Sequence, residues 1–272
     1  MSTSRYVHGT DPVEQARLSL LNELLNTACL REARVQPGER VLDVGAGLGQ
    51  LTRALARAAG TPALAVERSA EQRGKAEALA REDGEAGLLQ LREGDALQLP
   101  LAEAEWGTFD LGHARFILEH VPTPEAVVRQ LARPVRPGGR VVLTDDDHSL
   151  LRLHPEPPGL REVWGAFIRT YDRNGNDPYV GRRLTSLLQE AGLRPTRATW
   201  IPFGGCAGDG TFQGVVENLA GNLRGARAAI AATGAVRAED VDRAVAALAD
   251  FARTPGAALG YAFPWAEGVR PA

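Results

Sequence analysis

Short apolar runs alternate with helix-patterned segments along the first half of the chain. The runs have the length of buried strands, and the segments between them carry apolar residues at helical spacing. Strands are expected at residues 40–45, 62–67, 86–96, 109–114 and 138–145, and helices at 11–34, 49–60, 69–83 and 124–135. Successive strand and helix units predict a doubly wound α/β domain, in which helices cover both faces of a parallel sheet.

The alternation changes after Asp147, where residues 148–180 carry many prolines and aromatic side chains. The pattern then resumes with a helix at 181–192, a strand at 193–202, amphipathic helices near 211–232 and 238–253, and a last strand at 258–268. We expect three parts: an N-terminal helical cap at 1–35, a core at 36–203 plus 256–272, and a helical lid insertion at 204–255.

Composition and charge narrow the range of partners. The 272 residues carry a net charge of -3, which argues against a broad nucleic-acid-binding surface. Cys29 and Cys206 lie far apart without metal-ligand spacing, so neither a disulfide framework nor a zinc site is indicated. No signal peptide or membrane-spanning segment is evident. We therefore expect a cytoplasmic protein that acts on a small molecule, with no nucleic-acid or membrane partner, and leave a homodimer open.

The stretch VLDVGAGLGQLT, residues 41–52, joins the first strand to the next helix. Gly45, Gly47 and Gly49 alternate along it, whereas a dinucleotide-binding fingerprint would place its last glycine where this chain has Gln50. A loop at a helix N-terminus attracts anions, so Asp43 at its lip suits a pyrophosphate poorly and a cationic ligand well. A tight turn without a ligand is the alternative interpretation of this loop alone.

Two further strand ends carry acidic residues. Glu67 ends the second expected strand, where a carboxylate can accept both ribose hydroxyls of a nucleoside. Asp95 and Ala96 lie just beyond the third strand, where a carboxylate and the backbone can contact an adenine. Acidic residues on three successive strand ends fit a ligand that has a nucleoside and a positive end.

With these motifs the chain resembles the class I S-adenosylmethionine-dependent methyltransferases. The resemblance covers residues 36–147, through VLDVGAGLGQLT, AVERS, GDALQLP, FDLGHARFILEHV and RPGGRVVLTDD. It implies a Rossmann-like seven-stranded sheet of order 3-2-1-4-5-7-6, with the last strand antiparallel, and S-adenosylmethionine as cofactor. It further implies that the cofactor is bound by Tyr6, Asp43, Gly45, Ala46, Gly47, Gly49, Glu67, Arg68, Asp95, Ala96, His113, Arg115 and Phe116.

The segment after the fourth strand narrows the class. Methyltransferases of nucleic-acid or glutamine amino groups typically carry an (N/D)-P-P-(Y/F) motif there, whereas residues 113–116 read His-Ala-Arg-Phe. The chain is similar instead to the small-molecule branch, which methylates quinones, terpenoids and other natural products. In that branch a stretch like YVHGTDP folds over the cofactor, which would let Tyr6 close the site; a frayed tail is the alternative.

Candidates for a catalytic base follow the fourth and fifth strands. Methyl transfer needs alignment, exclusion of water and, for a protonated nucleophile, a base. His113 titrates in the right range, although packing on the cofactor is an equal alternative. Asp145 and Asp146 begin the run DDDH, and one of its aspartates is expected to accept a proton or hold a substrate cation. We expect no metal, because consecutive carboxylates on an extended segment point in alternating directions.

The second half is expected to supply the acceptor pocket. Its aromatic side chains would suit an apolar or flat substrate, although most of them are expected to be core: Trp164, Phe167, Tyr171, Tyr179, Phe203 and Phe212. Asn218 and Asn222 lie one turn apart beside an apolar stripe, so they face either this pocket or the next helix.

The sequence therefore predicts methyl transfer from S-adenosylmethionine to an oxygen, nitrogen or carbon of a small organic acceptor, with natural-product biosynthesis as the setting. An NAD(P)-dependent oxidoreductase is an alternative, because it would share the glycine loop and Glu67. A catalytically silent protein that binds S-adenosylmethionine is the alternative outside catalysis.

Overall fold

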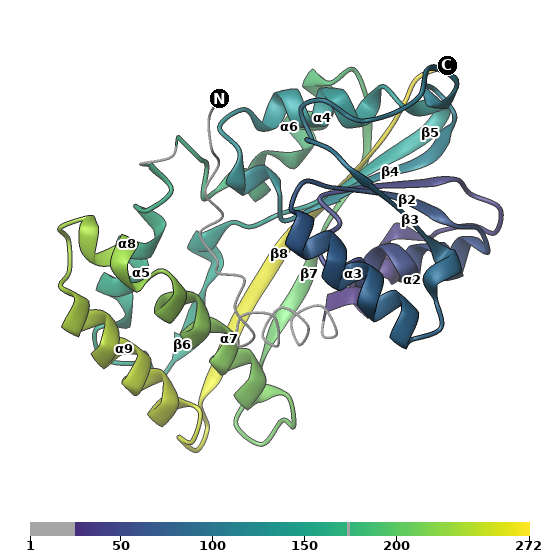
Figure 1. Cartoon of the computed structure of the whole chain (residues 1–272). Helices are drawn as coiled ribbons and strands as arrows, with labels where there is room; N and C mark the ends of the chain where they lie inside the picture. The colour runs from purple at the N-terminus through teal and green to yellow at the C-terminus, as the bar shows by residue number, and fades with distance from the viewer. Residues whose placement is uncertain (1–24, 173–174) are drawn as a thin grey trace.

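A computed structural model describes residues 25–172 and 175–272 (Figure 1). Residues 25–33 are helical. The strands are β1 (Val41–Val44), β2 (Ala63–Glu67), β3 (Leu89–Glu93), β4 (Phe109–Arg115), β5 (Val135–Thr144), β6 (Arg152–His154), β7 (Arg194–Cys206) and β8 (Ala258–Val269). The helices are α2 (Gln50–Ala59), α3 (Ala70–Glu82), α4 (Pro124–Ala132), α5 (Leu160–Ile168), α6 (Leu184–Glu190), α7 (Phe212–Gly225), α8 (Arg227–Ala232) and α9 (Ala238–Phe251). Short 3-10 helices are η1 (Ala86–Leu88), η2 (Glu103–Glu105), η3 (Leu118–His120), η4 (His148–Leu150) and η6 (Val180–Arg183).

The strands form one sheet of order β3-β2-β1-β4-β5-β8-β6, and β7 pairs along the other edge of β8. The neighbours from β3 to β5 are parallel, whereas β8 is antiparallel to β5, β6 and β7. Apart from the short additional strand β6, this is the expected order with an antiparallel last strand. The predicted doubly wound fold is therefore confirmed.

Separate apolar cores lie on the two faces of the sheet. On one face α4 and α6 bury Val127, Leu131 and Leu187 against the strands. On the other face α2 and residues 25–33 pack on the sheet, and fully buried Trp265 of β8 joins their core. Burying a large apolar side chain stabilises the fold by about 1.5–3 kcal/mol, so these two layers hold the strand ends in place.

Helices α5, α7, α8 and α9 form a helical lobe beside the sheet (Figure 1). Their apolar faces meet in a third core, which contains Phe167, Phe212, Leu223 and Leu248. The long strands β7 and β8 lead from the sheet to this lobe. Whether the lobe acts as a lid stays a prediction. None of the helices within the described ranges has the length and apolar character needed to span a membrane.

Helix α5 corrects the interpretation of residues 148–180, for which the sequence indicated no regular element. Leu160, Val163 and Phe167 have helical spacing and are buried in the core of the lobe. Pro155, Pro157 and Pro158 lie before the helix and Pro178 lies after it, so none of them interrupts its hydrogen bonds. The lobe therefore includes a segment that the sequence had placed in the sheet domain.

Candidate functional site

A cavity of about 270 Å³ lies over the carboxyl ends of β1, β2 and β4, and we call it the loop cavity. Of the cofactor-binding residues expected from the sequence, it is lined by Asp43, Gly45, Ala46, Gly47, Glu67, Arg68, Asp95, Ala96, His113, Arg115 and Phe116. Tyr6 lies outside the residues that the structure describes. Because parallel strands end at the same edge of a sheet, side chains far apart in sequence meet here.

Gly49 is the exception to the expected set. It has a φ of 68° directly before α2, and a Cβ at this position would lie 3.3 Å from Leu89 and 3.5 Å from Ala76. Gly49 therefore allows α2 to start close to β3 and α3, and it does not line the loop cavity. The structure thus gives Gly49 a packing role, and its contribution to cofactor binding stays a prediction.

Glu67 is held at the rim of the loop cavity by the backbone. The Gly47 N–H donates to its Oε2 at 3.0 Å, and the Ser69 N–H donates to its Oε1 at 2.8 Å. Gly47 has a φ of 54°, and a Cβ there would meet no atom within 4 Å. The glycine loop thus leaves open space beside a fixed carboxylate, which suits a ligand with adjacent hydroxyl groups.

Asp43 and His113 form a buried pair on the neighbouring strands β1 and β4. The Nδ1 atom of His113 lies 2.7 Å from Asp43 Oδ1, and the Thr52 hydroxyl donates to Asp43 Oδ2 at 2.5 Å. Only 2% of His113 and 4% of Asp43 is exposed. The structure thus ties the His113 ring to Asp43, and the role of His113 as a base stays a prediction.

Asp95 and Arg68 also line the loop cavity. Asp95 Oδ1 accepts the N–H of Leu97 at 2.8 Å, and its Oδ2 lies 3.8 Å from the Arg68 guanidinium. The neighbouring Ala96 lines the same cavity. The structure therefore brings together the acidic strand ends that the sequence singled out.

A second cavity adjoins the first, and we call it the aromatic cavity. Its apolar walls come from the sheet and the helical lobe: Phe116, Leu151, Trp164, Phe167, Phe203, Val215, Leu219, Leu259, Tyr261 and Phe263. Asn218 and Asn222 of α7 also line it, so of the two open alternatives the cavity is the one they face. Phe116 and His120 belong to both cavities.

Phe116 is one of the two residues that line both cavities. Its φ of 56° lies in the left-handed region, which a bulky residue adopts only when its surroundings enforce it. The Phe116 N–H donates to the Thr144 carbonyl at 3.0 Å, and its ring lies 4.8 Å from the ring of Phe263. The strained backbone therefore places an aromatic ring between the loop cavity and the aromatic cavity.

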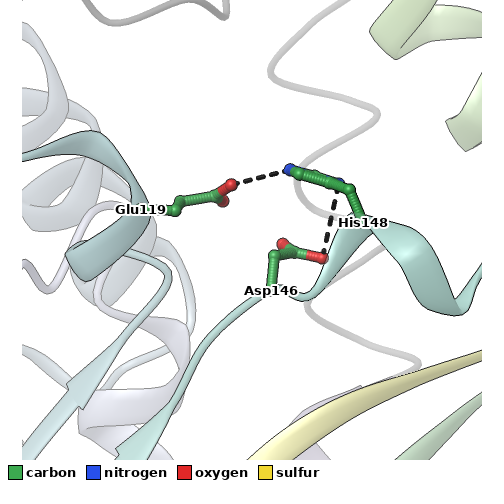
Figure 2. A group of neighbouring side chains, drawn as sticks. All are labelled: Glu119, Asp146 and His148. Atoms are coloured by element: carbon green, nitrogen blue, oxygen red, sulfur yellow. Dashed lines mark hydrogen bonds and ion pairs between the residues drawn. The ribbon is translucent and has the colours of Figure 1, made fainter. Parts of the chain in front are cut away.

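The polar part of the aromatic cavity is a cluster of Glu119, Asp146 and His148 (Figure 2). Glu119 follows β4 in η3, and the other two follow β5. The Nε2 atom of His148 lies 2.9 Å from Glu119 Oε2, and its Nδ1 lies 3.9 Å from Asp146 Oδ1. The imidazole thus bridges two carboxylates.

Two tyrosines complete this cluster. The Tyr261 hydroxyl donates to Asp146 Oδ1 at 2.5 Å, and the Tyr171 hydroxyl lies 3.1 Å from His148 Nε2. Burial, together with the nearby carboxylates, raises the pKa of both phenols well above its usual value. Both hydroxyls are therefore neutral hydrogen-bond donors.

The three consecutive aspartates point to different partners, as the sequence predicted. Buried Asp145 accepts backbone N–H groups of residues 117–119, Asp146 lines the aromatic cavity, and Asp147 pairs with Arg182 at 2.8 Å. Asp145 is fully buried and lies outside the lining of the cavity, so the geometry favours Asp146 over Asp145 as the residue that meets an acceptor.

Glu119, Asp146 and His148 are also the group within the described ranges that could hold a metal ion, because one ligand atom of each lies within 4.8 Å of the others. Both ring nitrogens of His148 already face carboxylates, and tyrosine hydroxyls fill further positions. The hydrogen-bonded network therefore accounts for the cluster. The absence of a metal stays a prediction.

Charge and burial shift the protonation of this cluster. Burial and the nearby Glu119 raise the pKa of Asp146 to about 7. Burial opposes the charged imidazole, but Asp146 and Glu119 outweigh it and raise the pKa of His148 to about 9. His148 is therefore a cation at neutral pH, whereas Asp146 changes its charge there.

Glu119 is the member of the polar cluster that sequence reasoning missed. It lies in the stretch ILEHV beyond β4, and nothing local in the sequence distinguishes it from a helix-forming surface residue. The predicted strand order could have identified Glu119. Because β4 and β5 are adjacent and parallel, the residues that follow their carboxyl ends lie close together.

We expect Asp145→Ala to lower the free energy of unfolding by about 2 kcal/mol, because buried backbone N–H groups of Leu118 and Glu119 lose their acceptor. Urea denaturation monitored by circular dichroism measures this change. Asp242→Ala is the control, since its exposed pair with Arg227 lies on the surface of the lobe. Equal midpoints for Asp145→Ala and the unmodified chain would contradict the assigned role.

Comparisons with known proteins agree with this geometry. Residues 14–198 match the family model described as a methyltransferase domain. The ubiquinone biosynthesis O-methyltransferase of Methylococcus capsulatus is 38% identical over 113 residues, which are 42% of this chain and 46% of that protein. The 27-O-demethylrifamycin SV methyltransferase of Amycolatopsis mediterranei is 31% identical over 193 residues, covering 68% of this chain and 63% of the relative.

The fold has counterparts among solved structures. A putative methyltransferase from Bacillus halodurans superposes with a TM-score of 0.61 and 17% identity, over 91% of this chain and 99% of the other. The chain spans between 39% and 49% of the length of the first curated relatives that it matches. These matches give no support to the nicotinamide alternative.

Proposed function

We propose that the chain methylates a hydroxyl oxygen of a small, mainly apolar acceptor. The premise is that the chain belongs to the family of methyltransferase domains and takes S-adenosylmethionine as its methyl donor. The observation that carries this proposal is the pair of adjoining cavities, which share Phe116 and His120. One cavity has the acidic rim that a cationic nucleoside needs. The other has aromatic walls and a polar cluster beside the first.

The residues of the loop cavity fit the donor. Glu67 would accept the ribose hydroxyls, Asp95 with the Ala96 backbone would contact the adenine, and Asp43 would face the ammonium group. When bound, S-adenosylmethionine supplies a methyl carbon activated by a sulfonium, with a neutral thioether as leaving group. The negative side chains match its positive end.

Within the aromatic cavity we assign proton acceptance to Asp146. It lines the cavity, and its pKa of about 7 leaves part of the carboxylate unprotonated at neutral pH. The rings of Phe116, Trp164 and Phe203 exclude water and favour a flat or apolar acceptor. The names of the ubiquinone and rifamycin relatives support oxygen as the acceptor atom and natural-product biosynthesis as the setting.

The free cysteines, buried Cys29 and exposed Cys206, support a reducing compartment such as the cytoplasm. A homodimer and the lid role of the helical lobe stay predictions.

The proposed function is tested by incubating the chain with S-adenosylmethionine and a panel of hydroxyl, amine and carbon-nucleophile acceptors. Mass spectrometry then searches for products that have gained one methylene mass, together with released S-adenosylhomocysteine. Transfer to hydroxyl compounds supports the proposal, whereas exclusive transfer to amines or carbons contradicts it. Binding of the donor without transfer across the whole panel would favour the catalytically silent alternative.

We expect Gly45→Ala to weaken S-adenosylhomocysteine binding by at least about tenfold, because a Cβ there would lie 2.2 Å from Ile117 Cγ2 and the φ is 76°. Isothermal titration calorimetry measures the affinity. Gly84→Ala is a matched control, since its φ is 71° but a Cβ meets nothing within 4 Å. If both variants bind like the unmodified chain, the glycine loop is not the donor site.

A further inference from the structure

We propose that Glu119 and the His148 ring, which flank Asp146 in the aromatic cavity with opposite charges, govern in opposite directions how readily Asp146 takes the proton of the acceptor. The inference rests on the proposed function, because it takes Asp146 as the proton acceptor. In it Glu119 favours protonated Asp146, whereas the His148 cation favours the carboxylate. Glu119 and His148 are thus positioning residues that act through Asp146.

The geometry places one negative and one positive neighbour around a single carboxylate. Figure 2 shows Glu119 and Asp146 pointing toward opposite ends of the His148 ring. The side chain of Asp146 is 13% exposed, whereas those of His148 and Glu119 are 8% and 4% exposed. The cavity thus reaches Asp146 more readily than either neighbour, which makes Asp146 the member that an acceptor meets.

Hydrogen bonds to backbone groups hold the segments that carry Glu119, Asp146 and His148 in place. Asp145 accepts the Leu118 N–H at 2.8 Å and the Glu119 N–H at 3.3 Å, which fixes the segment after β4 against the segment after β5. On the other side the Trp164 indole N–H donates to the His148 carbonyl at 2.9 Å. A fixed arrangement lets neighbouring charges act on Asp146 without rearrangement.

His148 is the cation of this cavity. The titratable groups around Asp146 come from η3, the end of β5, η4, the turn after α5 and β8, and they are Glu119, Asp145, His148, Tyr171 and Tyr261. His120 lines the same cavity. Burial lowers the pKa of His120, and both phenols are neutral. No arginine or lysine is among the described residues that line the aromatic cavity.

The protonation of the cluster agrees with this arrangement. Beyond burial, the charge of Glu119 raises the pKa of Asp146, and the charge of His148 lowers it. The outcome is a pKa of about 7 for Asp146, whereas His148, at about 9, holds its proton at neutral pH. His148 therefore cannot itself accept the proton of the acceptor under those conditions.

In the reaction the acceptor O–H bond breaks and its proton moves to a carboxylate oxygen of Asp146. The acceptor oxygen forms a bond to the methyl carbon, the bond from that carbon to sulfur breaks, and its electron pair stays on sulfur. The methylated acceptor is neutral, and Asp146 later returns its proton to water. No oxidant, reductant or other reactant is required.

The first test measures the titration of Asp146 directly and needs no acceptor. The full chain is labelled with ¹³C at the aspartate carboxyl carbons and saturated with S-adenosylhomocysteine, and the Asp146 signal is identified by its loss in Asp146→Asn. We expect a midpoint near pH 7, a midpoint at least one pH unit lower in Glu119→Gln, and one at least one pH unit higher in His148→Gln. Asp147→Asn is the control and should leave the midpoint unchanged, because Asp147 pairs with Arg182.

Shifts of the same sign in Glu119→Gln and His148→Gln, or no shift in either, would overturn the inference. The second test follows the pH dependence of kcat/KM with a phenolic acceptor, whose acidic limb should move in the same two directions. If the unmodified chain methylates no hydroxyl compound, the proposed function fails instead, and the carboxyl titration still decides whether the tuning exists.

Discussion

Asp146→Asn is expected to lower kcat/KM for methyl transfer to a phenolic acceptor by about 10²–10⁴, the usual contribution of a positioned base. The amide has nearly the shape of the carboxylate but cannot accept the proton. Because Asp146 lines the aromatic cavity and not the loop cavity, the affinity for S-adenosylhomocysteine should stay within about twofold. Initial rates from released S-adenosylhomocysteine, together with calorimetric titration, measure both quantities.

Asp147→Asn is the matched control, because it lies on the same segment but is tied to Arg182 and Ser149. It should retain most of the activity. A full loss of cofactor affinity in Asp146→Asn would show that the substitution damages the fold, and undiminished transfer would show that Asp146 is not the base.

Glu67→Gln is expected to weaken S-adenosylhomocysteine binding by about 10–100-fold. A hydrogen bond to a charged group contributes about 1.5–3 kcal/mol, and the variant loses the charge that would accept the ribose hydroxyls. Its amide group would also face the backbone N–H of either Gly47 or Ser69, which now donate to the two carboxylate oxygens. Calorimetry gives the affinity.

Glu93→Gln is the control for this prediction, because Glu93 ends the neighbouring strand β3 but pairs with Arg73 outside the loop cavity. Unchanged affinity in Glu67→Gln would remove Glu67 from the donor site. Asp43→Ala should also weaken binding, and it additionally leaves His113 buried without its partner.

The sequence was sufficient for those parts of the molecule that depend on local patterns and strand order. Alternating strands and helices predicted the sheet, and the acidic residues Asp43, Glu67 and Asp95 meet at its edge because they follow adjacent strands. The alternation of side chains along an extended segment separated Asp146 from Asp145 and Asp147 in direction. These inferences need no knowledge of distant contacts.

Other features depend on packing between segments far apart in the chain. The contact of Glu119 with His148 joins η3 to η4, and Tyr261 reaches Asp146 from β8. His113 appeared suitable as a base by residue type, but its position on a central strand buries it against Asp43. Residue type and spacing therefore predicted that the candidate residues lie at the carboxyl edge of the sheet. Contacts between distant segments determine which of these side chains line the aromatic cavity.

The connection between β7 and β8 carries helices α7 to α9 as one continuous insertion. Cys206 and Ala258 are paired neighbours at the ends of these strands, so everything from α7 to α9 departs from and returns to one point of a hairpin. Loop closure costs little more free energy for a long insertion than for a moderate one. Natural variation can therefore replace helices α7 to α9 as one unit, while the segments at the strand ends that carry Glu67, Glu119 and Asp146 remain unchanged.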